Sequence, residues 1–274
     1  MASRIRRNIA SGPQAAREAV VVIPARLGST RFPRKVLARE TGKYLIQHVW
    51  EGAAGAPGVS RTIIATDSPE VVEAARSFGA EAWLTSPTHL SGTDRVAEVA
   101  RSLSAEIVVN VQGDEPLIRK EDVAAVISLF QDAGEDVSMT TLAVERRDSE
   151  GLRDPNNVKV VLDLRGRALY FSRSPIPGNP ERAPGRNVPQ GSEEPAPWLH
   201  HVGIYGYRRQ FLLGWAGMRP GALEKIERLE QLRAIENGFE IRVGLTARCH
   251  RGIDTEEEYR EFLREYGPAA RPAR

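Results

Sequence analysis

The sequence predicts an α/β fold in which a mostly parallel central sheet is flanked by helices. Short runs rich in valine and isoleucine alternate along the first half of the chain with longer segments whose apolar residues recur at helical spacing. Strands and helices that alternate in this way form βαβ units with parallel strands. Polar and charged residues follow several of the apolar runs, and ligands of such sheets bind outside the carboxyl ends of the strands.

The first half of the chain supplies most of this pattern. We expect strands at residues 20–24, 62–66, 106–111 and 137–144, and helices at residues 44–54, 69–78, 94–103 and 121–131. The last of these helices follows Pro116 and has acidic residues in its first turn, which is typical of a helix start. The loops that follow the strands should therefore meet at one edge of the sheet.

The second half has a different pattern. A β-hairpin is expected at residues 158–162 and 168–172, around a turn that ends at Gly166, and a further strand at 202–207. One amphipathic helix is expected at residues 224–236, with an inward face formed by Ile226, Leu229, Leu232 and Ala234. Residues 178–197 contain five prolines and three glycines, which predicts a long loop that is a lid, an oligomer arm or disordered.

These elements predict one domain at residues 19–266, with a β-rich sub-lobe inserted at about 155–215. Residues 1–18 form a basic tail with four arginines. Its composition predicts disorder, although a transit peptide has a similar composition. Residues 267–274 are expected to form a loose C-terminal tail.

The composition argues against several classes of protein. The net charge is +2 and the excess lies in the basic tail, so no nucleic-acid-binding surface is expected. No apolar run approaches the length of a membrane span. The single cysteine, Cys249, excludes an internal disulfide and a cysteine-rich zinc site, and it fits a reducing, cytoplasmic compartment. The chain also lacks the G-x-S-x-G turn of a serine hydrolase.

The most informative segment is residues 20–35. A buried strand opens into a loop whose cations and hydroxyls include Arg26, Ser29, Arg31 and Lys35, and such a loop can hold phosphates. Neither G-x-G-x-x-G nor G-x-x-x-x-G-K-[ST] is present. We therefore expect side chains to hold the nucleotide, and a dinucleotide-binding oxidoreductase is disfavoured.

Carboxylates follow a second buried strand, at residues 108–116. Asp114 at the carboxyl end of a strand beside a phosphate loop points to Mg²⁺, while a simple turn is the alternative. Asp254 is a candidate for the second metal carboxylate, although Asp254 or Thr255 could merely cap the last helix. Ser91 and its neighbours begin another helix, where they cap it or face an anionic ligand.

The chain resembles the 3-deoxy-manno-octulosonate (KDO) cytidylyltransferases over about residues 20–262, and thereby a Rossmann-like nucleotidyltransferase fold. The runs that carry the resemblance are Ile23-Pro-Ala-Arg-x-x-Ser-Thr-Arg-x-Pro-x-Lys35, Ala65-Thr-Asp67, Ser91-Gly-Thr-Asp-Arg95, Val109-Asn-Val-Gln-Gly-Asp-Glu-Pro116, Asn157-x-Lys159, Leu169-Tyr-Phe-Ser-Arg173, His201-x-Gly-Ile-Tyr205, Leu229-Glu-Gln-Leu-Arg233 and Gly252-Ile-Asp-Thr255. The first and fourth runs resemble nucleotidyltransferases generally, and the later runs are more specific.

The resemblance implies an Mg²⁺-dependent enzyme that activates KDO with CTP, giving CMP-KDO and pyrophosphate for lipopolysaccharide biosynthesis. It implies Arg26, Lys35 and Asp114 as catalytic residues and Asp114 and Asp254 as Mg²⁺ ligands. The implied nucleotide-binding residues are Pro24, Ala25, Arg26, Ser29, Arg31, Lys35, Thr66, Asp67, Ser91, Gly92, Thr93 and Arg95. The implied sugar-binding residues are Gln112, Arg173, His201, Tyr205, Glu230 and Gln231. A cytoplasmic homodimer with CTP and KDO as small-molecule substrates is also implied.

Other functions remain open at this point. The sugar could be an 8-amino analogue of KDO or a sialic-acid-like nonulosonate, and an inactive relative could bind nucleotide as a regulator. Retention of Lys35, Asp114 and Asp254 argues against the inactive relative. The chain departs from the expected pattern at Arg34, where we expect glycine, so Arg34 must take a positive φ at a cost or the loop must differ. Glu256 stands where we expect proline, and either residue suits a first helical turn.

Overall fold

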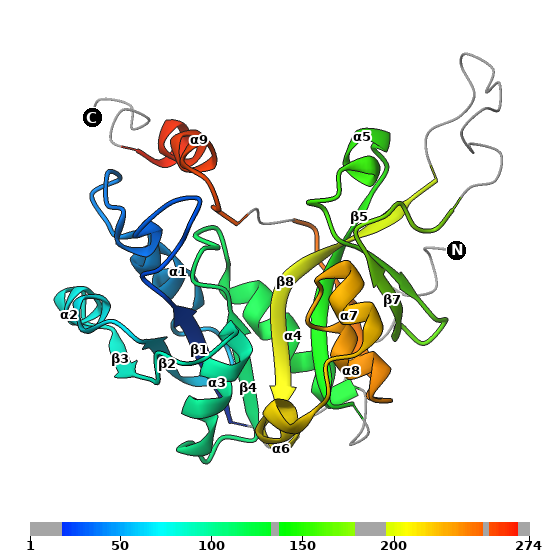
Figure 1. The fold of residues 1–274 in the computed structure, drawn as a ribbon, viewed down its shortest axis with the longest axis horizontal. Helices are drawn as coiled ribbons and strands as arrows, with labels where there is room; N and C mark the ends of the chain where they lie inside the picture. Colours follow the sequence, from blue (N-terminus) through cyan, green and yellow to red (C-terminus); the bar gives the residue numbers. More distant parts are fainter. Residues whose placement is uncertain (1–17, 133–136, 179–195, 249–251, 268–274) are drawn as a thin grey trace.

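The computed structural model describes residues 18–132, 137–178, 196–248 and 252–267. Within these ranges the chain forms a nine-stranded sheet whose main path runs β3-β2-β1-β4-β8-β5-β9, with β6 and β7 attached through β8. Figure 1 shows helices on either side of this sheet. The expected basic tail, most of the proline-rich loop, Cys249 and nearly all of the C-terminal tail lie outside the described residues.

The strands are β1 Ala19–Ala25, β2 Val59–Thr66, β3 Glu81–Leu84, β4 Ile107–Val111, β5 Met139–Arg146, β6 Lys159–Leu162, β7 Ala168–Ser172, β8 Trp198–Arg208 and β9 Ile241–Leu245. The α-helices are α1 Leu45–Ala53, α2 Pro69–Ser77, α3 Gly92–Arg101, α4 Lys120–Asp132, α5 Ser149–Arg153, α6 Arg209–Gly214, α7 Ala222–Glu227, α8 Leu232–Glu236 and α9 Glu256–Tyr266. The 3-10 turns η2 and η4 span Lys35–Leu37 and Trp215–Gly217. The expected α/β class with a mostly parallel sheet is confirmed.

β8 is the exception to the parallel arrangement of the main path. It pairs antiparallel with β4 on one side and with β5 on the other, whereas β1–β2, β1–β4, β2–β3 and β5–β9 are parallel pairs. In Figure 1 the arrow of β8 points opposite to that of β1. The carboxyl ends of β1, β2 and β4 therefore lie at one edge of the sheet, as predicted.

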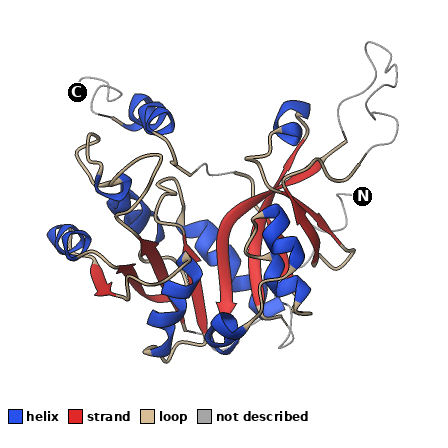
Figure 2. Ribbon diagram, in the orientation of Figure 1, coloured by secondary structure: helices blue, strands red, loops and turns tan. Residues whose placement is uncertain are grey.

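Two apolar layers hold the helices on the sheet. Figure 2 shows these helices against the strands. One layer combines alternate residues of β1 and β4, such as Val21 and Val109, with α1, α2 and α4. The other combines Val22 and Val108 with α3, α6 and α8. Because these strands are covered on both faces, they appear in the sequence as continuous apolar runs rather than alternating ones.

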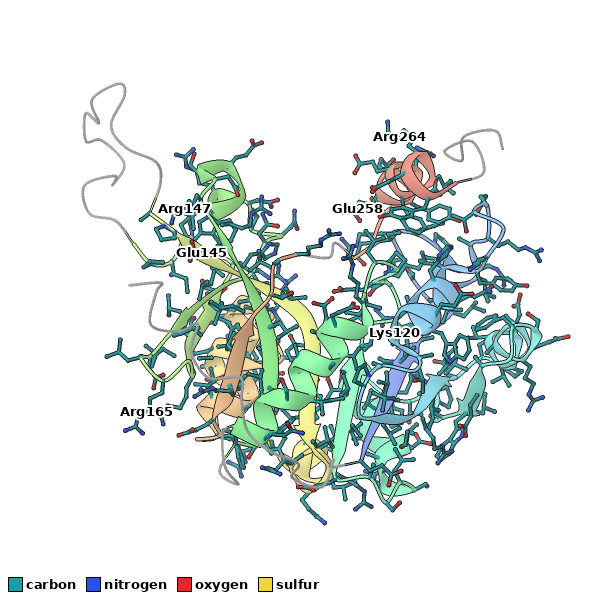
Figure 3. All side chains as sticks on the ribbon, turned by 180° about the vertical axis from the view of Figure 1, so that it is seen from behind. Lys120, Glu145, Arg147, Arg165, Glu258 and Arg264 are labelled. Carbon is teal, nitrogen blue, oxygen red and sulfur yellow. The ribbon has the colours of Figure 1, made fainter. Side chains whose placement is uncertain are left out.

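The expected hairpin forms from β6 and β7, and its turn contains Gly166 at φ 77°. β6 also pairs with the outer part of β8, so the hairpin is tied to the central sheet by a strand of 11 residues. Trp198, at the start of β8, donates its indole N–H to the carbonyl of Asp148 beside α5. Near that end of β5, Arg147 pairs with Glu145 (Figure 3).

The prediction of a single helix at residues 224–236 is wrong. α7 ends at Glu227, the next residue Arg228 has φ 54°, and α8 begins at Leu232. The Glu236 carboxylate accepts hydrogen bonds from the backbone nitrogens of Leu223 and Glu224, which would lie about 20 Å away in one straight helix. The two short helices therefore fold back on each other. Ile226 is 77 % exposed instead of facing inward, whereas the other three expected inward residues are buried.

Strands β3 and β9 were not predicted from the sequence. β3 is an edge strand of only four residues, none of which is buried, so its pattern is too short to identify a strand. β9 is a short strand in which Ile241 and Val243 are buried and alternate with polar or small neighbours. None of the helices in the described ranges is long and apolar enough to cross a membrane.

Candidate functional site

A charged cluster joins three segments at the carboxyl edge of the sheet. The Lys35 ammonium donates to Asp114 Oδ2 at 2.6 Å, to Asp254 Oδ1 at 2.9 Å and to the carbonyl oxygen of Ile253 at 2.9 Å. Lys35 begins η2 after the β1 loop, Asp114 follows β4 and Asp254 precedes α9. The Ile253 backbone nitrogen donates to the Asp114 carbonyl oxygen at 2.8 Å, which fixes the last two segments to each other.

The charges of this cluster support one another. Burial disfavours the ammonium form of Lys35, but Asp114 and Asp254 outweigh this effect and raise its pKa. Burial likewise disfavours the Asp254 carboxylate, but hydrogen bonding to Lys35, the charge of Lys35 and the nearby Arg31 lower its pKa. Lys35 and Asp254 are therefore both charged at neutral pH.

The other cations of the β1 loop remain accessible. Arg31 donates to Asp254 Oδ2 at 2.7 Å and its side chain is 63 % exposed. Arg26 is exposed and makes no hydrogen bond or ion pair with any other described residue, and Ser29 lies half-exposed between them. This side of the site combines fixed and free positive charge, which suits a polyanionic ligand.

Arg34 adopts the left-handed conformation. Sequence analysis left open whether this residue would take a positive φ or the loop would differ. It has φ 61° and ψ 21° at the position before η2. Its guanidinium pairs with Glu70 in the first turn of α2. The extra cation of this loop is thus directed toward α2 in this structure and away from the Lys35 cluster.

Close backbone packing brings three segments of the site together at Pro24. This proline lies beyond the last β1–β4 pair, Val22 with Asn110, so its missing N–H breaks no bond of that ladder. A side chain at Gly92 would meet the Pro24 ring at 3.3 Å, and one at Gly113 would meet the Pro24 carbonyl oxygen at 2.6 Å. Glycines at both positions allow α3 and the β4 loop to approach the end of β1.

The ends of β2 and α3 hold an inward-facing arginine. Arg95 is buried and donates to Asp67 Oδ2 at 2.8 Å and to the hydroxyl of Thr85. Thr66 is fully buried, and its hydroxyl accepts a hydrogen bond from the Ser68 backbone nitrogen. Arg95 therefore fixes the loop after β2 from the buried side. Ser91 caps α3, because its hydroxyl oxygen accepts a hydrogen bond from the Asp94 backbone nitrogen.

Three of the residues predicted to bind the sugar lie on β8 or in the loop after β4. His201 and Tyr205 lie with ring centroids 5.4 Å apart, and His201 Nε2 is 3.0 Å from the Thr141 hydroxyl. Burial, with a smaller contribution from the charge of His200, lowers the pKa of His201 to about 3. His201 is thus a neutral hydrogen-bonding group. The Gln112 amide lies beside Gly92 and donates to Asn110 Oδ1 at 3.4 Å.

Arg173 lies at the end of β7 and is held by carbonyl oxygens. Its guanidinium donates to the carbonyls of Glu227 and Pro155, both at 2.9 Å. The Glu227 carboxylate accepts from the Ser172 hydroxyl and the Arg173 backbone nitrogen. The fully buried Lys159 donates to three carbonyls, including that of Arg173, and burial lowers the pKa of this lysine.

Glu230 and Gln231 lie in the turn between α7 and α8. Glu230 accepts from the Thr93 hydroxyl at 2.7 Å and from the Trp215 indole at 3.3 Å. Gln231 is 4 % exposed, and its Nε2 has no hydrogen-bond partner among the described residues. The same is true of Asn110 Nδ2. Buried polar atoms without partners are rare and call for an explanation such as an absent ligand.

Comparison with known proteins identifies the family. The Cytidylyltransferase family matches residues 20–241. A 3-deoxy-manno-octulosonate cytidylyltransferase of Solibacter usitatus is 49 % identical over 90 % of this chain and 94 % of its own length, and one of Geobacter metallireducens is 48 % identical over 85 % and 92 %. This chain belongs to the 3-deoxy-manno-octulosonate cytidylyltransferase family. A CMP:2-keto-3-deoxy-manno-octonic acid synthetase solved in complex with CTP has a TM-score of 0.80 at 40 % identity, over 89 % of this chain and 96 % of that one. A Leptospira borgpetersenii cytidylyltransferase at 16 % identity, with a TM-score of 0.56 and 88 % and 83 % coverage, shares the fold.

Several residues that shape this cytidylyltransferase site were not predicted from the sequence. Glu227 and Lys159 position Arg173, although the run Asn157-x-Lys159 was part of the resemblance. Glu115 is buried, with one carboxylate oxygen unpartnered among the described residues. Burial, followed by repulsion from three aspartates, raises its pKa to about 8.

Asp114 and Asp254 are the carboxylates of this site that sequence analysis assigned to a metal ion. Within the described ranges, no group of three or more histidine, cysteine, aspartate or glutamate side chains is arranged to hold a metal ion. Asp254 is nonetheless fixed firmly. Its backbone nitrogen donates to Glu258 (Figure 3) at 2.7 Å, and Glu258 also completes a capping box with Thr255 at the start of α9. Asp114 and Asp254, the two carboxylates that bind the Lys35 ammonium, are therefore both held by structured segments.

Proposed function

We propose that this protein transfers a cytidylyl group from CTP to KDO and releases pyrophosphate. The observation that carries the proposal is the Lys35, Asp114 and Asp254 cluster at the carboxyl edge of the sheet, flanked by Arg26 and Arg31. It combines cations for a triphosphate with carboxylates for a metal ion at the carboxyl ends of β1 and β4, the neighbouring strands between which the strand order reverses. Open α/β sheets bind ligands at such a point.

The reaction requires charge stabilisation more than covalent catalysis. The anomeric hydroxyl oxygen of KDO attacks the α-phosphorus of CTP, the bond from that phosphorus to the bridging oxygen breaks, and pyrophosphate leaves with its electron pair. The hydroxyl loses its proton to solvent or a nearby base. In this proposal Arg26 and Lys35 neutralise the triphosphate, with Arg31 beside them.

We propose that Asp114 and Asp254 hold Mg²⁺. Two observations support it. Both carboxylates lie within hydrogen-bond distance of one nitrogen, that of Lys35, so they can converge on one cation. Mg²⁺ also commonly takes one or two carboxylates together with phosphate oxygens and water, which fits a site with two carboxylates. The bound ion would lower the pKa of the attacking hydroxyl and stabilise the α-phosphate.

The remaining residues divide between the two substrates. The nucleotide side would use the segments that meet at Pro24, including Ala25, Ser91 and Gly92. The sugar side would use Gln112, Arg173, His201, Tyr205, Glu230 and Gln231. The unpartnered Nε2 of buried Gln231 supports a polar ligand there, and an arginine such as Arg173 can bind a carboxylate with two hydrogen bonds.

We further propose a cytoplasmic homodimer. The lone cysteine supports the reducing compartment. The exposed apolar side chains Leu164, Leu169 and Ile226, which are 95 %, 58 % and 77 % exposed, support a partner on the face formed by the β6–β7 hairpin and α7. Analytical ultracentrifugation tests this proposal, because a monomer at micromolar concentration contradicts it.

Pyrophosphate release tests the proposed reaction. Purified protein is mixed with Mg²⁺, CTP and one of KDO, its 8-amino analogue or a nonulosonate. Release with KDO at the highest kcat/KM is expected. Release with a nonulosonate alone contradicts the sugar assignment, and equal rates with ATP or UTP contradict the assignment of CTP. CTP binding without turnover of any sugar would support an inactive relative instead.

A further inference from the structure

The hydroxyl proton of Thr93 is donated within the protein, to the carboxylate of Glu230. Thr93 is the second residue of α3, and its side chain is almost fully enclosed, since the residue is 3 % exposed. A hydroxyl has one proton, and this one is donated to Glu230 Oε2 at 2.7 Å. This interaction points into the protein, toward the α7–α8 turn.

The other oxygen of Glu230 is fixed from a different element. The indole nitrogen of Trp215, at the start of η4, donates to Glu230 Oε1 at 3.3 Å. Trp215 is itself held in place, because it is 1 % exposed and the guanidinium of Arg233 stacks 4.8 Å from its ring centroid. Arg233 in turn binds both oxygens of Glu224, at 2.9 Å and 2.6 Å.

One donor on each oxygen sets the plane of the Glu230 carboxylate. A carboxylate can accept about four hydrogen bonds, so each oxygen keeps the capacity to accept another. Glu230 is half-buried rather than enclosed, and its remaining capacity suits donors such as sugar hydroxyls. Without its two anchors, the side chain of a residue in a short turn after Arg228 would sample several rotamers, and ordering it would reduce the affinity for the sugar.

We infer that Thr93, together with Trp215, is a positioning residue for the sugar substrate that acts through Glu230 and does not contact the nucleotide. The inference rests on the proposed function, in which Glu230 binds the sugar acid. It assigns the helix start at residues 91–93 two roles: Ser91 and Gly92 face Pro24 and the nucleotide side, while Thr93 faces the sugar side. α3 thereby links the two subsites.

Steady-state kinetics of isosteric variants test this role. Thr93→Val removes the hydroxyl and keeps the shape of the side chain. Since a hydrogen bond to a charged group is involved, we expect the KM for KDO to rise by about tenfold, with the KM for CTP changed by less than twofold. Thr93→Ser, which keeps the hydroxyl, should restore most of the affinity for KDO. Thr88→Val, on an exposed loop threonine whose hydroxyl reaches Ser86, is the matched control and should leave both KM values unchanged.

A double-mutant cycle separates an action through Glu230 from a general effect on folding. If Thr93 acts through this carboxylate, adding Thr93→Val to Glu230→Ala should change the KM for KDO by less than twofold, because Glu230→Ala already removes the acceptor of the Thr93 hydroxyl. Trp215→Phe keeps an aromatic side chain but replaces the indole with a smaller phenyl ring that has no N–H, so it should reproduce the selective effect on KDO. Thermal unfolding of each variant shows whether it is folded, and Trp215→Phe provides the test if Thr93→Val is not.

The outcomes distinguish the inference from the proposed function. A wild-type protein that releases no pyrophosphate with CTP and any sugar acid overturns the proposed function and this inference with it. An active wild type in which Thr93→Val raises the KM for CTP and leaves that for KDO unchanged overturns the inference alone. Full additivity of Thr93→Val and Glu230→Ala would also overturn it.

Discussion

Lys35 and Asp114, 79 positions apart in the sequence, form an ion pair of 2.6 Å between Nζ and Oδ2. The lysine side chain is 11 % exposed and the aspartate 29 %, so the pair is screened from water more than a surface pair would be. It fixes the β1 loop against the β4 loop at the proposed reaction centre. In the proposed mechanism, the same two residues contact the triphosphate and the metal ion.

Lys35→Met should lower kcat/KM for CTP by about a hundredfold or more, because it removes a fixed cation where charge develops in the transition state. Lys35→Arg keeps the charge but replaces a compact ammonium with a planar fork, so we expect partial activity. Lys120, exposed at the start of α4 (Figure 3), provides the control variant Lys120→Met, which should behave as wild type. Equal activity of Lys35→Met and Lys120→Met in pyrophosphate release would contradict the role of Lys35.

Asp114→Asn should remove most of the activity and weaken metal binding. The substitution keeps the shape of the side chain but removes the negative charge that a hard divalent cation prefers. Chelation by EDTA should likewise stop wild-type turnover, and added Mg²⁺ should restore it. Binding of Mn²⁺ in the presence of CTP, measured by electron paramagnetic resonance, gives a readout independent of turnover. Unchanged Mn²⁺ affinity in Asp114→Asn would make Asp114 a turn residue instead of a ligand.

The elements that the sequence predicts well are those with strong apolar patterns. β1, β2 and β4 are covered on both faces, so their continuous apolar runs identify them. β3 has no buried residue, and its pairing with β2 depends on the tertiary structure. The break at Arg228 was not predictable from periodicity, because 224–236 satisfies a helical pattern. It results from Glu236 reaching back to the start of α7, a contact that local sequence does not encode.

In the candidate site, too, some features are predictable from the sequence and others depend on tertiary contacts. The rule that ligand loops follow the carboxyl ends of parallel strands, together with the family resemblance, indicated Lys35, Asp114 and Asp254, and the structure brings their side chains into contact. It does not follow from sequence which way a polar side chain of the site points. Arg95 turns inward to Asp67, and Thr93 turns to Glu230, because their partners come from segments 28 and 137 positions away.

Stability should fall in mild acid because of His201. Its pKa is lowered to about 3 in the folded protein, whereas an unfolded histidine titrates near 6.5. The stabilisation is therefore fully present above about pH 6.5 and is lost as the pH falls toward 3, since the unfolded chain then binds a proton that the folded chain excludes. Between pH 7 and pH 5 this single group should cost up to about 2 kcal/mol. Urea unfolding at pH 7, 6 and 5 should show a shallower pH dependence in His201→Gln than in the wild type, and an identical dependence would contradict the assignment.

Arg34→Gly should not reduce stability. A left-handed residue other than glycine costs about 1 kcal/mol or more, and the Arg34–Glu70 pair that would be lost has side chains 56 % and 49 % exposed, so its contribution is small. Arg34→Val, which places a β-branched side chain at φ 61°, should destabilise the protein by about 1 kcal/mol relative to the wild type. Denaturant unfolding measures both. A large loss in Arg34→Gly would mean that the ion pair with α2, rather than the backbone conformation, dominates at this position.

Gly113→Ala should separate the two loops that form the site. The added methyl group would lie 2.6 Å from the carbonyl oxygen of Pro24, and because both atoms belong to main-chain segments, neither can move without shifting β1 or the β4 loop. Asp114 follows directly, so its carboxylate would move relative to Lys35. Displacements of about 1 Å from a reactive geometry can lower rates about a hundredfold, and we expect a loss of this order in kcat/KM. Gly214→Ala, where the new methyl group meets nothing within 4 Å, is the control and should retain full activity. A Gly113→Ala enzyme as active as the Gly214→Ala enzyme would show that the approach of the β4 loop to Pro24 is not needed to place Asp114.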